Sequence, residues 1–176
     1  MKIMKTLRKL NEHCPELVAK SFFKNLKFPS ALVQYLEITA LQDLAGDAFI
    51  LLINVFTTEI PITPKFVQKI CQSLEFIEDD NTLHSLTSIL VCLVPHFEKI
   101  SPDPDDIKLN PILKEFVAKE QFYREELIYI TNRGGTYRLG ECAECLDIML
   151  HKPELACYYF NINDLNLIMD ILMREI

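Results

Sequence analysis

Apolar residues recur along most of the chain at intervals of three and four positions, which is the spacing of one face of an α-helix. In the stretch after Pro64, for example, Phe66, Val67, Ile70 and Leu74 follow this spacing. Prolines precede several such stretches, as is common in the first turn of a helix. They are Pro15, Pro29, Pro64, Pro111 and Pro153. No window alternates polar and apolar residues beyond a few positions, so the pattern predicts an all-α protein.

Local signals predict where the central helices begin and end. Thr63, just before a first-turn proline, is a typical N-cap, and Asp80 or Asn81 is expected to cap the next helix. Pro95 lies inside the pattern of that helix and is expected to bend it or to end it near its last turn. Residues 101–106, Ser-Pro-Asp-Pro-Asp-Asp, predict a loop.

The pattern predicts about ten helices joined by short connections, which group into five pairs. The pairs cover residues 1–27, 30–58, 64–98, 110–132 and 138–176. Their starts are spaced too irregularly for tetratricopeptide or ankyrin repeats, but they fit a degenerate armadillo- or HEAT-like solenoid. A globular helix bundle is the alternative, although five successive pairs exceed what one bundle core usually encloses. We therefore expect a single armadillo/HEAT-like helical domain over residues 1–176.

Composition and charge narrow the possible functions. The 176 residues are 49% hydrophobic and include only 4 glycines, too few for the tight turns of an all-β fold. A net charge of -7 disfavours nucleic-acid binding. Residues 1–27 nevertheless carry seven Lys or Arg and two Glu. Lys20, Lys24 and Lys27 are therefore candidate contacts to an acidic partner, with a solvated helix face as the alternative.

The sequence indicates a cytoplasmic protein without a membrane span. The charged residues 1–9 are not followed by the apolar stretch of a secretory signal. The longest uncharged stretch, residues 81–97, contains too many polar side chains to cross a bilayer. The six cysteines are accordingly expected to be reduced and mostly buried.

The sequence contains few residues whose spacing suggests a catalytic or metal-binding site. Cys142, Cys145, His151 and Cys157 have a spacing that is compatible with a zinc site. Helical spacing favours another interpretation, in which the first two cysteines lie on the apolar stripe of a helix as small hydrophobic residues. No nucleotide-binding, hydrolase, metalloprotease or kinase motif is present. We expect a protein that is not an enzyme and needs no cofactor, with a small zinc-binding protein as an alternative.

Three segments in the second half carry a family resemblance. Residues 127–134 form an apolar run that ends in Asn-Arg-Gly, and Tyr158-Tyr159-Phe160 precedes a long apolar segment at 164–176. Together with residues 146–150, they resemble the WISH/DIP proteins, the Nck-interacting SH3 adaptor of animals and its fungal homologues. The resemblance implies an armadillo-like domain that binds and activates the Arp2/3 complex. Such proteins seed linear actin filaments without a mother filament, which implies a place in cortical actin patches and endocytosis.

The resemblance also has departures. The chain has no SH3 domain or proline-rich linker, and Gly135 stands where an acidic residue is expected after Asn-Arg-Gly. The family continues with further helices beyond the point that corresponds to Ile176, so we expect a truncated version of the domain. Truncation is expected to leave four apolar side chains without a covering layer. They are Leu167, Ile168, Ile171 and Leu172.

The glycine-flanked turn after residue 132 supplies the first candidate contacts to a partner. Arg133, Tyr137 and Arg138 lie there, and Arg and Tyr are enriched in binding hot spots. An Arg that closes the C-terminus of a helix and a Tyr that packs under the loop are the alternative interpretation. A generic armadillo/HEAT adaptor with an unrelated partner is the alternative function.

Overall fold

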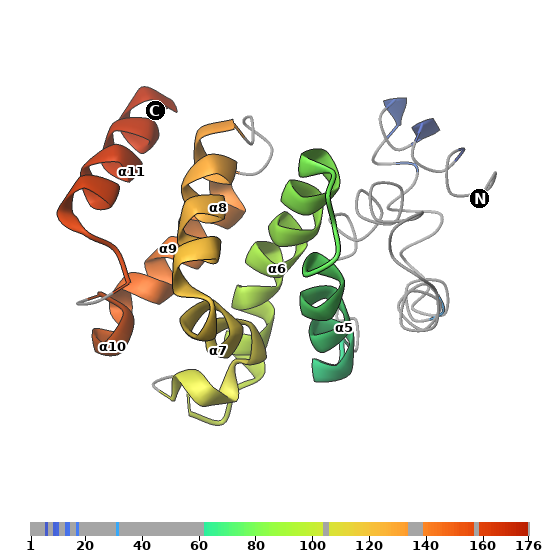
Figure 1. Cartoon of the computed structure of the whole chain (residues 1–176), viewed down its shortest axis with the longest axis horizontal. Coiled ribbons are helices and arrows are strands. Elements are labelled where there is room, and N and C mark those ends of the chain that lie inside the picture. Colours follow the sequence, from blue (N-terminus) through green and yellow to red (C-terminus); the bar gives the residue numbers. More distant parts are fainter. Residues whose placement is uncertain are drawn as a thin grey trace. The chain divides into compact units, whose positions relative to one another are not determined.

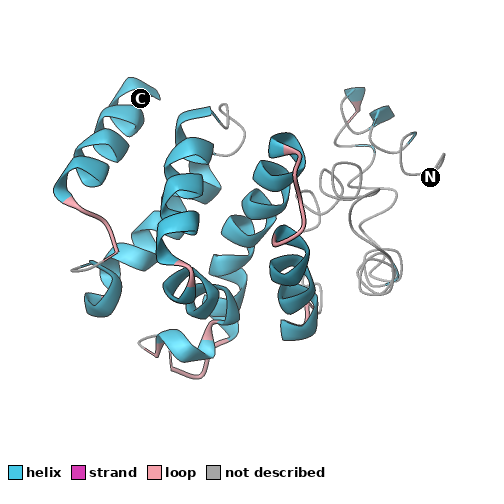
Figure 2. Cartoon of the chain, viewed as in Figure 1, coloured by secondary structure: helices cyan, strands magenta, loops and turns pink. Residues whose placement is uncertain are grey.

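The computed structural model describes the main part of the chain from Ile62 onward. The described residues are 6, 9, 10, 13, 14, 17, 31, 62–103, 106–133, 139–156 and 159–175. Within these residues all regular secondary structure is helical and no β-strand occurs, which confirms the all-α prediction (Figure 2). The helices expected over residues 1–58 lie outside this description apart from isolated positions.

The described ranges contain seven α-helices and one short 3₁₀ helix. These are α5 (Pro64–Leu74), α6 (Asp80–Ile100), η3 (Ile107–Leu109), α7 (Pro111–Ala118), α8 (Glu120–Arg133), α9 (Leu139–His151), α10 (Pro153–Ala156) and α11 (Ile162–Glu175). The chain divides into two compact units, Met1–Ile89 and Leu90–Ile176, with the boundary inside α6. The expectation of one domain over the whole chain stays a prediction.

The start of α5 is as predicted. The side chain of Thr63 accepts a hydrogen bond from the backbone N–H of Phe66 at 3.3 Å, and Pro64 occupies the first helical position. A proline at this position removes no hydrogen bond from the helix, because the first N–H groups of a helix have no partner inside it. One face of α5 is buried. Its residues are Phe66, Val67, Ile70, Cys71 and Leu74.

The cap of α6 is one residue earlier than predicted. Asp80 is already the first helical residue, and the Asp79 carboxylate accepts a hydrogen bond from the Thr82 N–H at 2.7 Å. A carboxylate at this place also interacts favourably with the positive end of the helix dipole. The hydrogen bonds from the Thr82 side chain and backbone lower the pKa of Asp79. The prediction of Asp80 or Asn81 as the cap is therefore wrong.

Pro95 does not end α6. The helix continues for five further residues to Ile100, although an internal proline forgoes one backbone hydrogen bond and typically costs about 3 kcal/mol. Val94 and Phe97, on either side of Pro95, are buried in unit 2. Burial of this apolar segment offsets the cost of the proline, an effect that local sequence signals do not contain.

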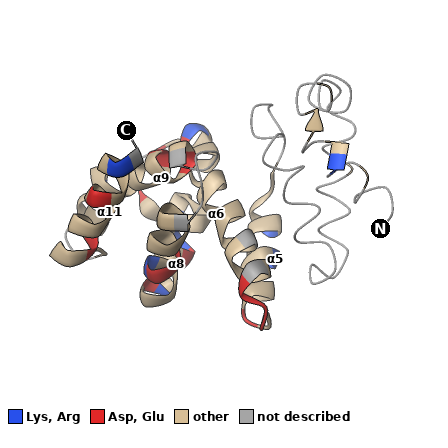
Figure 3. Cartoon of the chain, turned by 90° about the horizontal axis from the view of Figure 1, so that it is seen from above, with Lys and Arg blue, Asp and Glu red and all other residues tan. Residues whose placement is uncertain are grey.

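Unit 2 is a set of helices that pack against one another and bury apolar side chains. Helix α7 packs on η3 and α8, α8 also packs on α9 and α11, and α10 packs on α9 (Figure 1). The rings of Phe116 and Tyr123 stack at the junction of α7 and α8, with their centroids 4.6 Å apart. This arrangement leaves α11 at the edge of the unit, beyond α8 (Figures 1 and 3).

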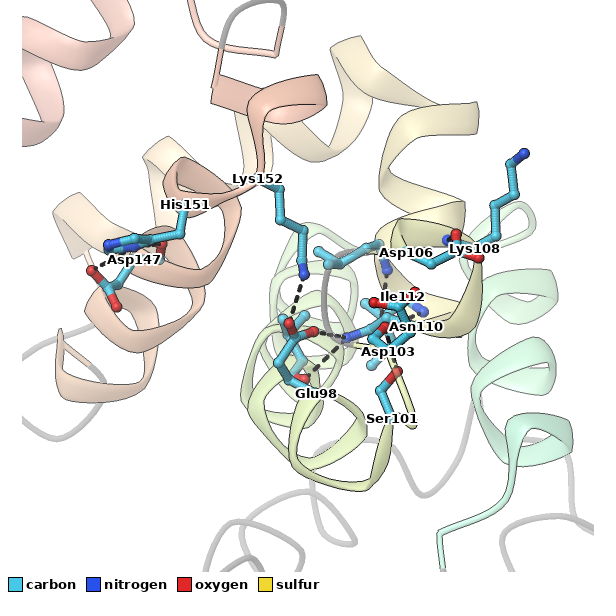
Figure 4. A network of polar contacts seen from close by, with 12 residues as sticks. Glu98, Ser101, Asp103, Asp106, Lys108, Asn110, Ile112, Asp147, His151 and Lys152 are labelled. Atoms are coloured by element: carbon cyan, nitrogen blue, oxygen red, sulfur yellow. Dashed lines mark hydrogen bonds and ion pairs between the residues drawn. The ribbon is translucent and has the colours of Figure 1, made fainter.

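A buried polar network joins three elements of unit 2 (Figure 4). The Lys152 ammonium, after α9, lies 2.6 Å from the Glu98 carboxylate of α6, and the Lys152 residue is only 4% exposed. Asn110 donates to the Val94 carbonyl oxygen at 3.2 Å and to Glu98 at 3.4 Å. Its own side-chain oxygen accepts from the backbone N–H groups of Ile112 and Leu113, which caps α7. A buried lysine is rare unless it is paired, as it is here.

We predict that Lys152→Met destabilises the protein by about 3 kcal/mol, because it leaves the Glu98 carboxylate in a largely buried site without its cation. The double variant Glu98→Gln/Lys152→Met should recover most of this loss, since no unpaired charge remains. Urea unfolding followed by circular dichroism measures both free energies. Equal stability of Lys152→Met and the unaltered chain would contradict this account of the pair.

A second prediction concerns His96, which lies half-buried on α6 with its ring edge-to-face against Phe97. Burial, together with Lys99, lowers its pKa below the ordinary value of 6.5. The unfolded chain therefore takes up a proton at a higher pH than the folded chain does. We expect stability to fall as the pH drops below about 6.5.

His96→Gln should flatten this part of the pH dependence, measured as the urea midpoint between pH 7.5 and 5. His151→Gln is the matched control, because His151 is exposed. An unchanged pH slope in His96→Gln would refute the assignment.

Candidate protein-interaction surface

Helix α11 begins with a reciprocal cap. The Asn161 side-chain oxygen accepts from the N–H groups of Asn163 and Asp164 at 2.9 and 3.0 Å. In return, the Asp164 carboxylate accepts from the Asn161 N–H at 3.0 Å. This is the arrangement of a capping box, which satisfies three backbone donors and fixes the direction in which the helix leaves the preceding turn.

Helix α8 holds α11 near both of its ends. Arg124 of α8 lies 3.6 Å from the Asp164 carboxylate and donates to the Tyr159 carbonyl oxygen at 3.3 Å. The same guanidinium pairs with Glu120 at 2.7 Å, which keeps it extended toward α11. Near the other end, Arg174 donates to the Asn132 side chain at 3.1 Å. These contacts restrict both sliding and rotation of α11 on α8.

The inner side of α11 is formed by Ile168 and Ile171, which are 3% and 2% exposed. The adjoining side, next to this buried stripe, carries an apolar row that we call the outer face of α11. It consists of Ile162, Leu165, Met169, Leu172 and Met173, which follow helical spacing. Ile162, Met169 and Met173 are 69%, 56% and 66% exposed, and the two leucines are partly exposed.

The outer face differs from an ordinary scatter of exposed apolar residues. Its members are successive neighbours along one helix, and none of them is charged. Figure 3 shows charged residues at only a few points of α11. Contiguous apolar surface of this kind marks sites of protein association, whereas single exposed apolar residues are normal. Because α8 fixes the helix, the face is presented in one orientation.

The expectation that four apolar side chains near the end of the chain lack a covering layer is partly wrong. Ile168 and Ile171, predicted to lack a covering layer, are buried. Leu167 is exposed and Leu172 is partly exposed, as predicted. Of the residues that form the outer face, only Leu172 was singled out, although their spacing of three and four positions is a signal for an amphipathic surface.

Most of the predicted contact residues cannot be placed. Arg133 is the last residue of α8 and follows Asn132, whose side chain binds Arg174 of α11. The backbone at Arg133 is thus close to the C-terminal part of α11. The other candidates lie outside the described residues. They are Lys20, Lys24, Lys27, Tyr137 and Arg138.

The cysteines of the alternative zinc site lie in a different environment from that of a metal centre. Cys142 and Cys145 are buried on α9, and the Cys145 sulfur lies 4.0 Å from that of Met149. Burial raises the pKa of Cys145. The His151 ring nitrogen lies 2.8 Å from the Asp147 carbonyl oxygen on an exposed side of α9. Cys157 lies outside the described residues.

Across the described ranges, no group of three or more His, Cys, Asp or Glu residues is arranged to hold a metal ion. Five cysteines are described there, none of them in a disulfide, and four of them are buried. Within the same ranges, no helix has both the length and the apolar character needed to cross a bilayer. No family model, curated protein or solved structure matches the chain.

We predict that Arg124→Gln loosens α11 without unfolding unit 2. The loss of its charged hydrogen bonds should cost about 1.5 kcal/mol. Hydrogen exchange, followed by mass spectrometry, should show faster exchange of the backbone amides of 162–175. Glu125→Gln is the matched control, since Glu125 is an exposed neighbour whose side chain accepts a hydrogen bond from Gln121 of the same helix. Unchanged exchange in Arg124→Gln would mean that packing alone holds the helix.

Proposed function

We propose that this chain is a non-catalytic, armadillo/HEAT-like helical domain that binds the Arp2/3 complex and activates it to nucleate linear actin filaments. In this proposal the protein acts in the cytoplasm at cortical actin. Binding uses the outer face of α11, and activation requires no chemistry by the chain itself.

The observation that carries the proposal is the outer face of α11. Three of its five side chains are more than half exposed on a helix that hydrogen bonds and ion pairs hold near both ends. A fixed surface loses less conformational entropy on binding than a mobile one, so more of the contact energy remains as affinity. This favours a binding role over a purely structural one for α11.

The choice of partner rests on the sequence resemblance. The segments that carry it coincide with particular elements of unit 2. Residues 127–133 form the second half of α8, residues 146–150 lie in α9, and residues 164–175 lie in α11. Since α8 packs on both α9 and α11, the resemblance falls on neighbouring helices. Such clustering is expected if these helices form one binding region.

Activation in this proposal is a population shift. The Arp2/3 complex exchanges between inactive and active arrangements, and a ligand shifts the balance only by its difference in affinity for the two. A rigid helical surface is suited to this role, because it fits one arrangement better than the other. Catalytic residues are not required.

The test is a pyrene-actin polymerisation assay with purified Arp2/3 complex and no pre-formed filaments. The chain should shorten the lag phase only when the complex is present. We predict that Ile162→Glu/Met169→Glu weakens binding to the complex about tenfold or more, because two carboxylates then lie in an apolar contact. Val117→Glu is the matched control, since Val117 is a half-exposed apolar residue of α7.

The other outcomes separate the possible errors. Equal effects of the two variants would exclude the outer face as the contact. The exchange of Lys20, Lys24 and Lys27 for Glu, and that of Arg133, Tyr137 and Arg138 for Ala, would then test the remaining candidates. Binding without acceleration would leave the chain as a ligand of the complex that does not activate it. Failure of the unaltered chain to bind at all would reject the Arp2/3 complex in favour of an unrelated partner.

A further inference from the structure

Two methionines occupy the middle and the end of the outer face of α11. Met169 and Met173 lie one helical turn apart and are 56% and 66% exposed. Met149 of α9 is 0% exposed in the core of the same unit. The chain therefore contains accessible and inaccessible thioethers within one folded unit, and both accessible ones belong to the outer face.

We propose that Met169 and Met173 are a reversible oxidation site that turns the outer face of α11 from apolar to polar. Peroxide is the oxidant. Each thioether sulfur gives up two electrons to a peroxide molecule, whose O–O bond breaks. One oxygen atom forms the sulfoxide S=O bond, and the other leaves as water. A sulfoxide reductase reverses the change.

The position of the two sulfurs makes the change effective. A sulfoxide is a polar group with a strong hydrogen-bond acceptor, and burying it against an apolar partner without a donor is unfavourable. Met169 lies between Leu165 and Leu172 along the row, so its oxidation interrupts the face at its centre. Met173 extends the same interruption toward the end of the helix.

Competing sulfur groups in the described part of the chain are largely shielded. Cys71, Cys92, Cys142 and Cys145 are buried, and the thiolate form of Cys145 is disfavoured by its environment. Cys14 is exposed and is the described thiol that peroxide reaches most easily. A Cys14→Ser background removes this reaction, and peptide mapping assigns each added oxygen atom to its own residue.

The first measurement needs no partner. The Cys14→Ser chain is treated with limiting hydrogen peroxide and mapped by peptide mass spectrometry. Peptides that contain Met169 and Met173 should gain one oxygen atom per sulfur well before the Met149 peptide does. Oxidation should also shorten retention on a hydrophobic-interaction column. Met169→Leu/Met173→Leu, which keeps the face apolar without a sulfur, should show no such shortening. Equal oxidation of Met149, or retention that oxidation does not change, would overturn the proposal.

The second measurement rests on the proposed function, because it uses the Arp2/3 complex as the probe. Oxidation should weaken binding about tenfold, and a methionine sulfoxide reductase should restore it. Met169→Leu/Met173→Leu is compared with itself before and after peroxide treatment, and peroxide should not change the affinity that this variant has. If Ile162→Glu/Met169→Glu abolishes binding but oxidation does not, the control of partner binding by oxidation is wrong and the proposed function stands. If the untreated chain does not bind the complex, the proposed function fails. The oxidation site is then tested by the peptide mapping and the hydrophobic-interaction chromatography alone.

Discussion

The ion pair between Lys152 and Glu98 is the contact on which the organisation of unit 2 depends. It joins the end of α6 to the turn between α9 and α10, two segments that are 54 positions apart in sequence. Asn110 extends the contact to the start of α7. Since the pair is largely buried, it adds more to the definition of one arrangement than to net stability. Helix α8 packs on α7, and α11 packs on α8, so the positions of both helices depend on this arrangement.

Local sequence signals were sufficient to predict which of the described segments are helical, but not where each helix begins and ends. Thr63 caps α5 as its sequence context predicts, because the cap and the first-turn proline act within one turn. The start of α6 is set by a local cap from Asp79 that the sequence analysis placed one or two residues too late, whereas its end depends on burial. Pro95 is tolerated inside the helix because its neighbours are buried, and burial is a property of the tertiary structure. The sequence pattern thus predicted which segments are helical better than where each helix ends.

The interaction surface was less predictable than the fold. Helical spacing alone cannot tell which of two apolar sides of α11 faces the core, because Ile168 and Ile171 are as apolar as Ile162 and Met169. The packing of α11 on α8 settles the choice, and the contact of Arg124 with Asp164 agrees with the same rotation. The spacing of Cys142 and Cys145 was interpreted correctly as a buried apolar stripe. That interpretation needed only the periodicity of one helix, whereas the outer face needed the packing of two.

Asn110 has two tasks at once, and this restricts which residue can replace it during evolution. Its oxygen caps α7, while its amide group donates to Val94 and Glu98. Aspartate would supply the cap but would bring a second carboxylate beside Glu98 and could not donate. Serine would supply the cap with a side chain too short to reach across to α6. Among related chains, position 110 should therefore vary less than its exposed neighbours Lys108 and Leu109.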